Sequence, residues 1–167
     1  MSDEAGHRVT VLQSVQCAWP VPRPLPTRAP DVLAAAELAA IAADVRQGRI
    51  PALSVRQPYA HYILYCGKDV ENRSWKTAYR GWLLLHVPAR ALPGASREMP
   101  RSAHIGMVEI IDCVAHSDSP WFAGPYGLIL GRRIALKKAI RANGSPGLFK
   151  PSLLDRSAVA AGLKTLT

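Results

Sequence analysis

The chain has 167 residues, of which 49% are hydrophobic, and a formal net charge of +9, so we expect one domain with tails. Its apolar runs are short and broken by Arg, His and Pro, well below the roughly 20 residues of a membrane-spanning helix. The first residues contain Asp3 and Glu4 and lead into no apolar stretch, which argues against a secretory signal. The three cysteines have no CxxC spacing. We therefore expect a cytoplasmic protein with reduced thiols, without metal or cofactor and without a membrane contact.

The positive charge is concentrated at the C-terminal end. Residues 127–167 hold eight Lys or Arg against one acidic residue, whereas residues 1–49 hold five of each. Such a stretch can neutralise phosphates and release condensed counterions. A solvated basic face that only aids solubility is the alternative. The candidate nucleic-acid contacts in this stretch are Arg132, Arg133, Lys137, Lys138 and Arg141.

The first part of the chain is rich in proline. Between residues 19 and 30, proline stands at nearly every second position, which favours an extended, polyproline-like tether. We take residues 1–30 as a flexible segment, and no specific motif supports a protein partner there. Residues 31–49 predict a helix, because Asp31 suits its start, an apolar stripe follows, and Gly48 suits its end.

Residues 50–151 form the predicted domain. It begins with a short apolar strand at 52–55, and a helix follows from Pro58, which suits a first turn, to Gly67, which suits a left-handed end. Residues 82–85 are apolar on both faces, which is typical of a central strand covered on both sides. The strands predicted in the domain after this helix are 68–75, 81–87, 106–115 and 127–130.

The end of the chain leaves one alternative open. Residues 132–141 fit either a helix or a strand that ends at the turn formed by residues 143–144. Residues 152–167 are predicted to form a C-terminal helical tail, with a short helix at 154–163.

The most unusual stretch is 67–75, GKDVENRSW, which places charged side chains inside a predicted strand. Because side chains alternate along a strand, Glu71, Arg73 and Trp75 share one face, and Lys68 lies at its mouth. Arg73 offers paired donors for a phosphate or a base edge, and Trp75 offers a stacking surface worth about 1–3 kcal/mol per base. Glu71 offers an acceptor for an amine. A solvated edge strand with a Glu–Arg pair is the alternative.

These residues and several separated segments resemble the ASCH domain, the activating signal cointegrator homology family. Of the family hallmark G-x-K-x-x-E-x-R, the K-x-x-E-x-R part is matched by Lys68, Glu71 and Arg73, while Gly67 stands one residue before Lys68 instead of two. Further similar segments follow the family's order: LSVRQPYA at 53–60, YRG at 79–81, IGMVEIIDC at 105–113 and GSPGLF at 144–149. The resemblance spans about residues 52–151. It implies an α+β, PUA-like small β-barrel with flanking helices, residues 134–136 in a strand, and a cleft at the hallmark strand that binds RNA, DNA or modified nucleotides.

Some members of this superfamily are enzymes. In the acetylcytidine amidohydrolases that the chain is similar to, the hallmark Lys works with a Thr three residues later and a Glu from a later strand. The resemblance puts Lys68 and Glu109 on two of these positions, but Glu71 stands where those enzymes carry the Thr. Other relatives are ribonucleases that depend on the hallmark Lys. If the protein is an enzyme, the candidate catalytic residues are therefore Lys68, Glu71 and Glu109, in a chemistry that needs no metal.

Three further groups of residues are weaker candidates. Arg56 and Gln57 could face a ligand at the barrel rim, although Gln57 equally suits capping of the following helix. Tyr126 and the aromatic residues of the loop before it could close over a base, with ordinary loop packing as the alternative. The histidines show no HxH or HExxH spacing, so we expect no metal site, and His86 suits a hydrogen-bonded core position.

We therefore predict a protein that binds single-stranded RNA, DNA or one modified nucleoside in a cleft around the hallmark strand. Lys68 and Arg73 would contact phosphate or base, and Glu71 would accept from an amine. Trp75 or Tyr126 would stack on a base, while the basic C-terminal stretch would hold the flanking backbone. The alternative is a small metal-independent hydrolase that acts on an acylated nucleoside or on RNA.

Overall fold

The computed structural model describes residues 25–167. The start of the chain, including most of the proline-rich segment and Cys17, lies outside the described part. The described elements are, in chain order, α1 (Ala35–Arg46), β1 (Ala52–Ser54), α2 (Tyr59–Tyr65), β2 (Val70–Arg73), β3 (Gly81–Val87), β4 (Ala103–Val114), β5 (Tyr126–Arg141), β6 (Leu148–Phe149) and α3 (Leu153–Lys164).

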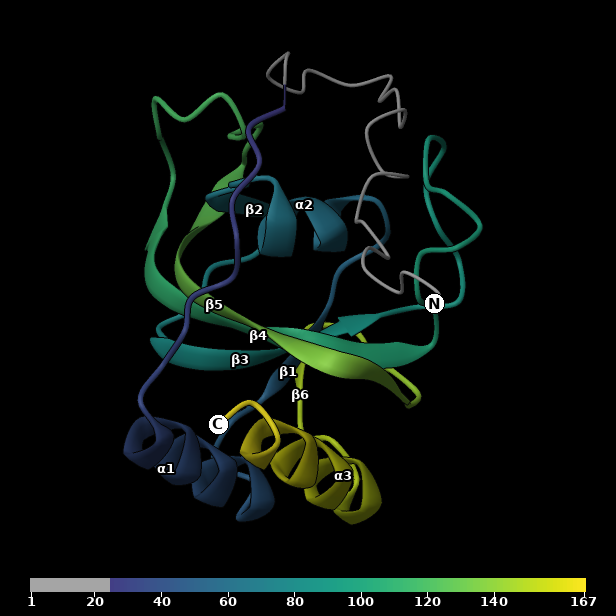
Figure 1. Ribbon diagram of the computed structural model, residues 1–167. Helices are drawn as coiled ribbons and strands as arrows, with labels where there is room; N and C mark the ends of the chain where they lie inside the picture. Colours follow the sequence, from purple (N-terminus) through teal and green to yellow (C-terminus); the bar gives the residue numbers. More distant parts are fainter. Residues whose placement is uncertain (1–24) are drawn as a thin grey trace.

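One six-stranded sheet, in the order β2-β5-β4-β3-β1-β6, curls into a half-barrel (Figure 1). Neighbouring strands run antiparallel except β1 and β3, which are parallel. The register of the long β4–β5 pair shifts at three places. Such bulges bend a strand and increase its twist, which allows these two strands to curve around the core. The α+β, PUA-like architecture expected from the sequence is confirmed.

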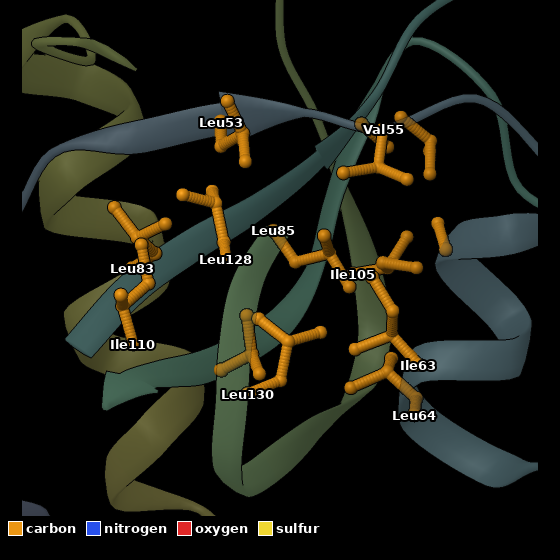
Figure 2. Packing of buried hydrophobic residues seen from close by; sticks show 14 residues of the cluster. Leu53, Val55, Ile63, Leu64, Leu83, Leu85, Ile105, Ile110, Leu128 and Leu130 are labelled. Atoms are coloured by element: carbon orange, nitrogen blue, oxygen red, sulfur yellow. The ribbon is translucent and has the colours of Figure 1, made fainter. Parts of the chain in front are cut away.

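Apolar layers cover both faces of the sheet, and β3 shows how one strand supplies both. Leu83 and Leu85 pack in one cluster with Ile63 of α2 (Figure 2). We call this cluster, on the α2 side of the sheet, the inner core. Leu84, between them, belongs to a second cluster on the opposite face, which we call the outer core. There α1 and α3 pack against the sheet and against each other. Figure 1 shows α1 and α3 side by side on one side of the sheet and α2 on the other. The prediction that residues 82–85 form a central strand covered on both sides is confirmed.

The N-terminal helix begins later than its sequence suggests. It starts at Ala35 instead of Asp31, because Asp31 is bound to β5. The backbone N–H of Arg133 donates to Oδ2 of Asp31 at 2.8 Å, and the N–H of Asp31 donates to the carbonyl of Arg133 at 2.7 Å. The N–H of Arg28 donates to the carbonyl of Tyr65 at 2.8 Å. Residues 25–34 therefore run along the domain and connect its α2 side to the α1 side.

The remaining differences lie near the C-terminus. Residues 132–141 form a strand, the second half of β5, which includes the residues 134–136 that the family resemblance places in a strand. The two-residue strand β6 pairs with β1 and was not predicted, because two residues carry no readable periodicity. The tail helix α3 is capped by Ser152, whose hydroxyl accepts from the N–H of Asp155. Within residues 25–167, no helix is long and apolar enough to cross a membrane.

Candidate nucleic-acid interface

Lys68 is buried, with only 2% of its surface exposed. The turn after α2 passes through Gly67, whose φ of 68° lies in the left-handed region that favours glycine, and the chain then turns inward. The ammonium of Lys68 donates to Oε2 of Glu71 at 2.8 Å and to the carbonyl of Val70. It also lies 5.5 Å from the ring centre of Tyr59. In this arrangement the ammonium of Lys68 is buried and bonded within the protein, and its predicted contact with a phosphate or a base stays a prediction.

Glu71 links this buried cation to a second one. Its Oε1 lies 3.3 Å from Nη2 of Arg73, while its Oε2 accepts from Lys68. The same Nη2 of Arg73 donates to the carbonyl of Ser54 at 2.7 Å. Arg73 therefore connects the end of β2, at one edge of the sheet, to the end of β1, near the other edge. The Nε of Arg73 is buried and has no hydrogen-bond partner in the part of the chain described.

The outer end of this chain of contacts is aromatic, and its two aromatic residues, Trp75 and Tyr126, are half-buried. The guanidinium carbon of Arg73 lies 5.9 Å from the ring centre of Trp75. Tyr126 of β5 stands directly opposite Arg73 in the β2–β5 ladder, so the two side chains leave the sheet on the same face. The ammonium of the exposed Lys76 lies 5.2 Å from the ring centre of Tyr126. We call Arg73, Trp75, Lys76 and Tyr126 the cationic rim.

The loop before β5 covers Lys68 from another side. Trp121 is 7% exposed, and its ring centre lies 5.9 Å from the Lys68 ammonium. Asn72 holds this loop with two hydrogen bonds: its side-chain amide donates to the carbonyl of Trp121 at 2.9 Å and accepts from the N–H of Ala123 at 2.8 Å. Ser119 donates to Asp69 at 2.6 Å. Of the two roles considered for the loop aromatics, the structure gives Trp121 a packing role.

Gln57 and Arg56, two of the weaker candidates, have different surroundings. Gln57 is 1% exposed, and its Oε1 accepts from the N–H of His61 at 3.0 Å in the first turn of α2. It therefore caps the helix, which was the alternative reading of this residue. Arg56 is exposed.

The C-terminal basic residues are not one free surface. Arg132 donates to Glu109 at 3.1 Å and to Glu37 of α1 at 2.7 Å. Arg133 is 1% exposed and donates to the carbonyl of Ile63 at 2.9 Å, and burial lowers the pKa of its guanidinium. These two arginines are therefore engaged in contacts within the fold, and their predicted phosphate contacts stay a prediction. Lys137 donates to the carbonyl of Thr165, and Lys138 and Arg141 are exposed.

Lys68 and Glu109, the two residues that the hydrolase alternative combines, are not brought into contact. The carboxylate of Glu109 is engaged by Arg132 beside α1. Lys68 is engaged by Glu71 beneath Trp121. No hydrogen bond or ion pair joins Lys68 to Glu109 among the described residues.

Sequence reasoning missed three contributors to this site. Ser54 acts through its backbone carbonyl, which no side-chain pattern reveals. Asn72 lies inside the hallmark, but its hydrogen bonds to the distant loop depend on the fold. Lys76 directly follows Trp75, and its proximity to an aromatic residue was the one available signal.

The sequence model of the ASCH domain matches residues 53–123. This segment runs from β1 to the loop that carries Trp121, and it contains Lys68, Glu71 and Arg73. Tyr126 and the strands β5 and β6 follow the matched segment and complete the same sheet. A search of curated proteins found no match to the chain.

Proposed function

This chain contains an ASCH domain at residues 53–123, and from that premise we propose that it binds single-stranded nucleic acid, RNA above all, at the cationic rim. ASCH domains are PUA-like, and RNA binding is general in the family. The observation that supports the rim as the binding surface is the position of Arg73. Its guanidinium is held at the surface end of a chain of contacts that begins at the buried Lys68.

The local charge favours an anionic ligand. Lys68 and Arg73 are both paired with the carboxylate of Glu71, and Lys76 adds a third cation beside Tyr126. Because Arg73 is already fixed by Glu71 and by the carbonyl of Ser54, little side-chain freedom is lost when a ligand binds. A guanidinium that is fixed in this way can offer its remaining donors to a phosphate or a base edge.

The aromatic residues supply the second part of the interaction. A base can stack on an aromatic ring whatever its identity, so stacking suits a ligand recognised with little sequence preference. The ring of Trp75 lies beside the guanidinium of Arg73, and Tyr126 is the register partner of Arg73 on the neighbouring strand. We propose that they stack on bases while Arg73 and Lys76 contact the sugar-phosphate backbone.

Lys138 and Arg141 would be secondary contacts. They lie toward the end of β5, whereas Tyr126 begins that strand. A ligand that touches both must follow the length of the strand, so we expect these residues to matter for long oligonucleotides only. The hydrolase alternative receives no support, because the carboxylate of Glu109 is bound to Arg132 and not to Lys68.

Replacement of Arg73 tests the proposal. We expect Arg73→Ala to weaken binding of a labelled single-stranded oligoribonucleotide by about ten- to a hundredfold, measured by fluorescence anisotropy. This corresponds to the loss of charge-assisted hydrogen bonds of about 1.5–3 kcal/mol. Arg73→Lys keeps the charge but loses the planar fork, so we expect an intermediate affinity.

Arg46→Ala is the matched control, because Arg46 is an exposed arginine on the helical layer that packs on the other face of the sheet. Circular dichroism melting of each variant separates lost binding from lost folding. If Arg73→Ala leaves both the affinity and its salt dependence unchanged, the rim is not the binding surface.

A further inference from the structure

The two aromatic rings of the cationic rim are both occupied by cations, but the two cations are held differently. Arg73, near Trp75, is fixed by the carbonyl of Ser54 and by Glu71. Lys76, near Tyr126, is exposed and has no ion-pair partner among the described residues. Of the two rings, the ring of Tyr126 is therefore the one that can be uncovered by moving one flexible side chain.

Uncovering that ring has a cost that depends on the ligand. An exposed cation–π contact is weaker than the stacking of a base on an aromatic ring, so a base can replace the ammonium. The displaced ammonium of Lys76 is then hydrated and can form a new ion pair. A phosphate attached to the stacked nucleotide supplies one at close range, whereas a neutral nucleoside supplies none.

We propose that Lys76 covers the ring of Tyr126 in the free protein and moves to a ligand phosphate when a base stacks there. The rim consequently selects a phosphorylated chain over a free nucleoside, whether or not the nucleoside is modified. This inference rests on the proposed function and names the chemical class of ligand for that surface. It also assigns opposite effects to one lysine: Lys76 strengthens the binding of a charged ligand and hinders the binding of a neutral one.

The test compares two short single-stranded oligouridylates that differ only in their linkages: one carries charged phosphodiesters and the other carries uncharged methylphosphonates. The variant is Lys76→Met, which keeps the length of the side chain and removes its charge. We expect Lys76→Met to weaken binding of the phosphodiester oligomer about tenfold and to reduce its salt slope by about one. We expect the affinity for the methylphosphonate oligomer to stay the same or to increase.

Lys164→Met is the control, because Lys164 is an exposed lysine at the end of α3, and it should change neither affinity. The inference is overturned if Lys76→Met weakens both oligomers by the same factor, or weakens neither. If the unmodified protein binds neither oligomer, the proposed function itself is wrong. Binding of the phosphodiester oligomer with no special effect of Lys76 would leave the proposed function standing and remove only this inference.

Discussion

At the scale of single residues, the most informative side chain is Lys68. The hallmark sequence led us to expect its ammonium at a ligand, yet the structure buries it against Glu71 and two aromatic rings. A buried cation is stable only with a partner, and Glu71 is that partner. Glu71 in turn contacts Arg73. Lys68 is therefore connected to Arg73 through the carboxylate of Glu71. The spacing of Lys68, Glu71 and Arg73 in the sequence predicts that they lie close together. It does not predict how deeply each side chain is buried.

Removal of the Lys68 charge should therefore reduce stability as well as binding. Lys68→Met leaves the carboxylate of Glu71 without its buried partner, so we expect the free energy of unfolding to fall by about 3 kcal/mol, measured by urea denaturation. The double variant Lys68→Met, Glu71→Gln removes both charges and should recover part of this loss. Equal instability of the single and double variants would show that the pair is not coupled.

At the scale of elements, β3 and β4 bring two buried histidines together. His86 and His104 are register partners in the β3–β4 pair, and their ring centres lie 5.3 Å apart. His86 has partners, because its ring nitrogens lie 2.9 Å from the Ser54 hydroxyl and 3.1 Å from the Ala142 carbonyl. His104 is fully buried, and neither of its ring nitrogens has a partner within residues 25–167. The expectation that His86 suits a hydrogen-bonded core position agrees with these contacts.

This histidine pair predicts a loss of stability in acid. Burial, and then the neighbouring His86, lower the pKa of His104 from 6.5 to about 4. Between these values the unfolded chain binds the proton that the folded chain does not, so the free energy of unfolding should fall as the pH drops from 6.5 to about 4. The total loss from His104 is about 3 kcal/mol. Urea midpoints across this range should fall less in His104→Leu than in the unmodified protein, and an equal fall in both would contradict this origin.

The bounds of some helices and strands could be predicted from the sequence, and those of others could not. Pro58 and Gly67 mark α2 correctly, because proline suits a first turn and glycine a left-handed end. Asp31 misled the prediction of α1, because its carboxylate accepts from β5 instead of capping a helix. Local patterns report local geometry, whereas the partners of Asp31 and Arg133 depend on which strands the fold brings together. For the same reason, charge counting could not separate Arg133, which is buried, from Lys138, which is exposed.

At the scale of the whole molecule, the proposed binding surface and the helical layer occupy different parts of the fold. The cationic rim lies at the end of β2 and the start of β5, near the side of the sheet that α2 covers. The helices α1 and α3 pack on the opposite face (Figure 1). Both helices lie outside the matched ASCH segment, yet their apolar side chains complete the outer core. We therefore expect the helical layer to contribute to stability and the rim to contribute to affinity.

The central claim is that nucleic acid binds at the rim through an arginine positioned by the buried Lys68–Glu71 pair. The most direct measurement is a nuclear magnetic resonance titration of the protein with a single-stranded oligoribonucleotide, following the Nε–H signal of Arg73 and the indole N–H signal of Trp75. We predict that both signals shift on binding and that the shifts are lost in the Lys68→Met variant under conditions where it remains folded. If both signals stay in place while the oligonucleotide binds and shifts the signals of α1 and α3, the claim is contradicted.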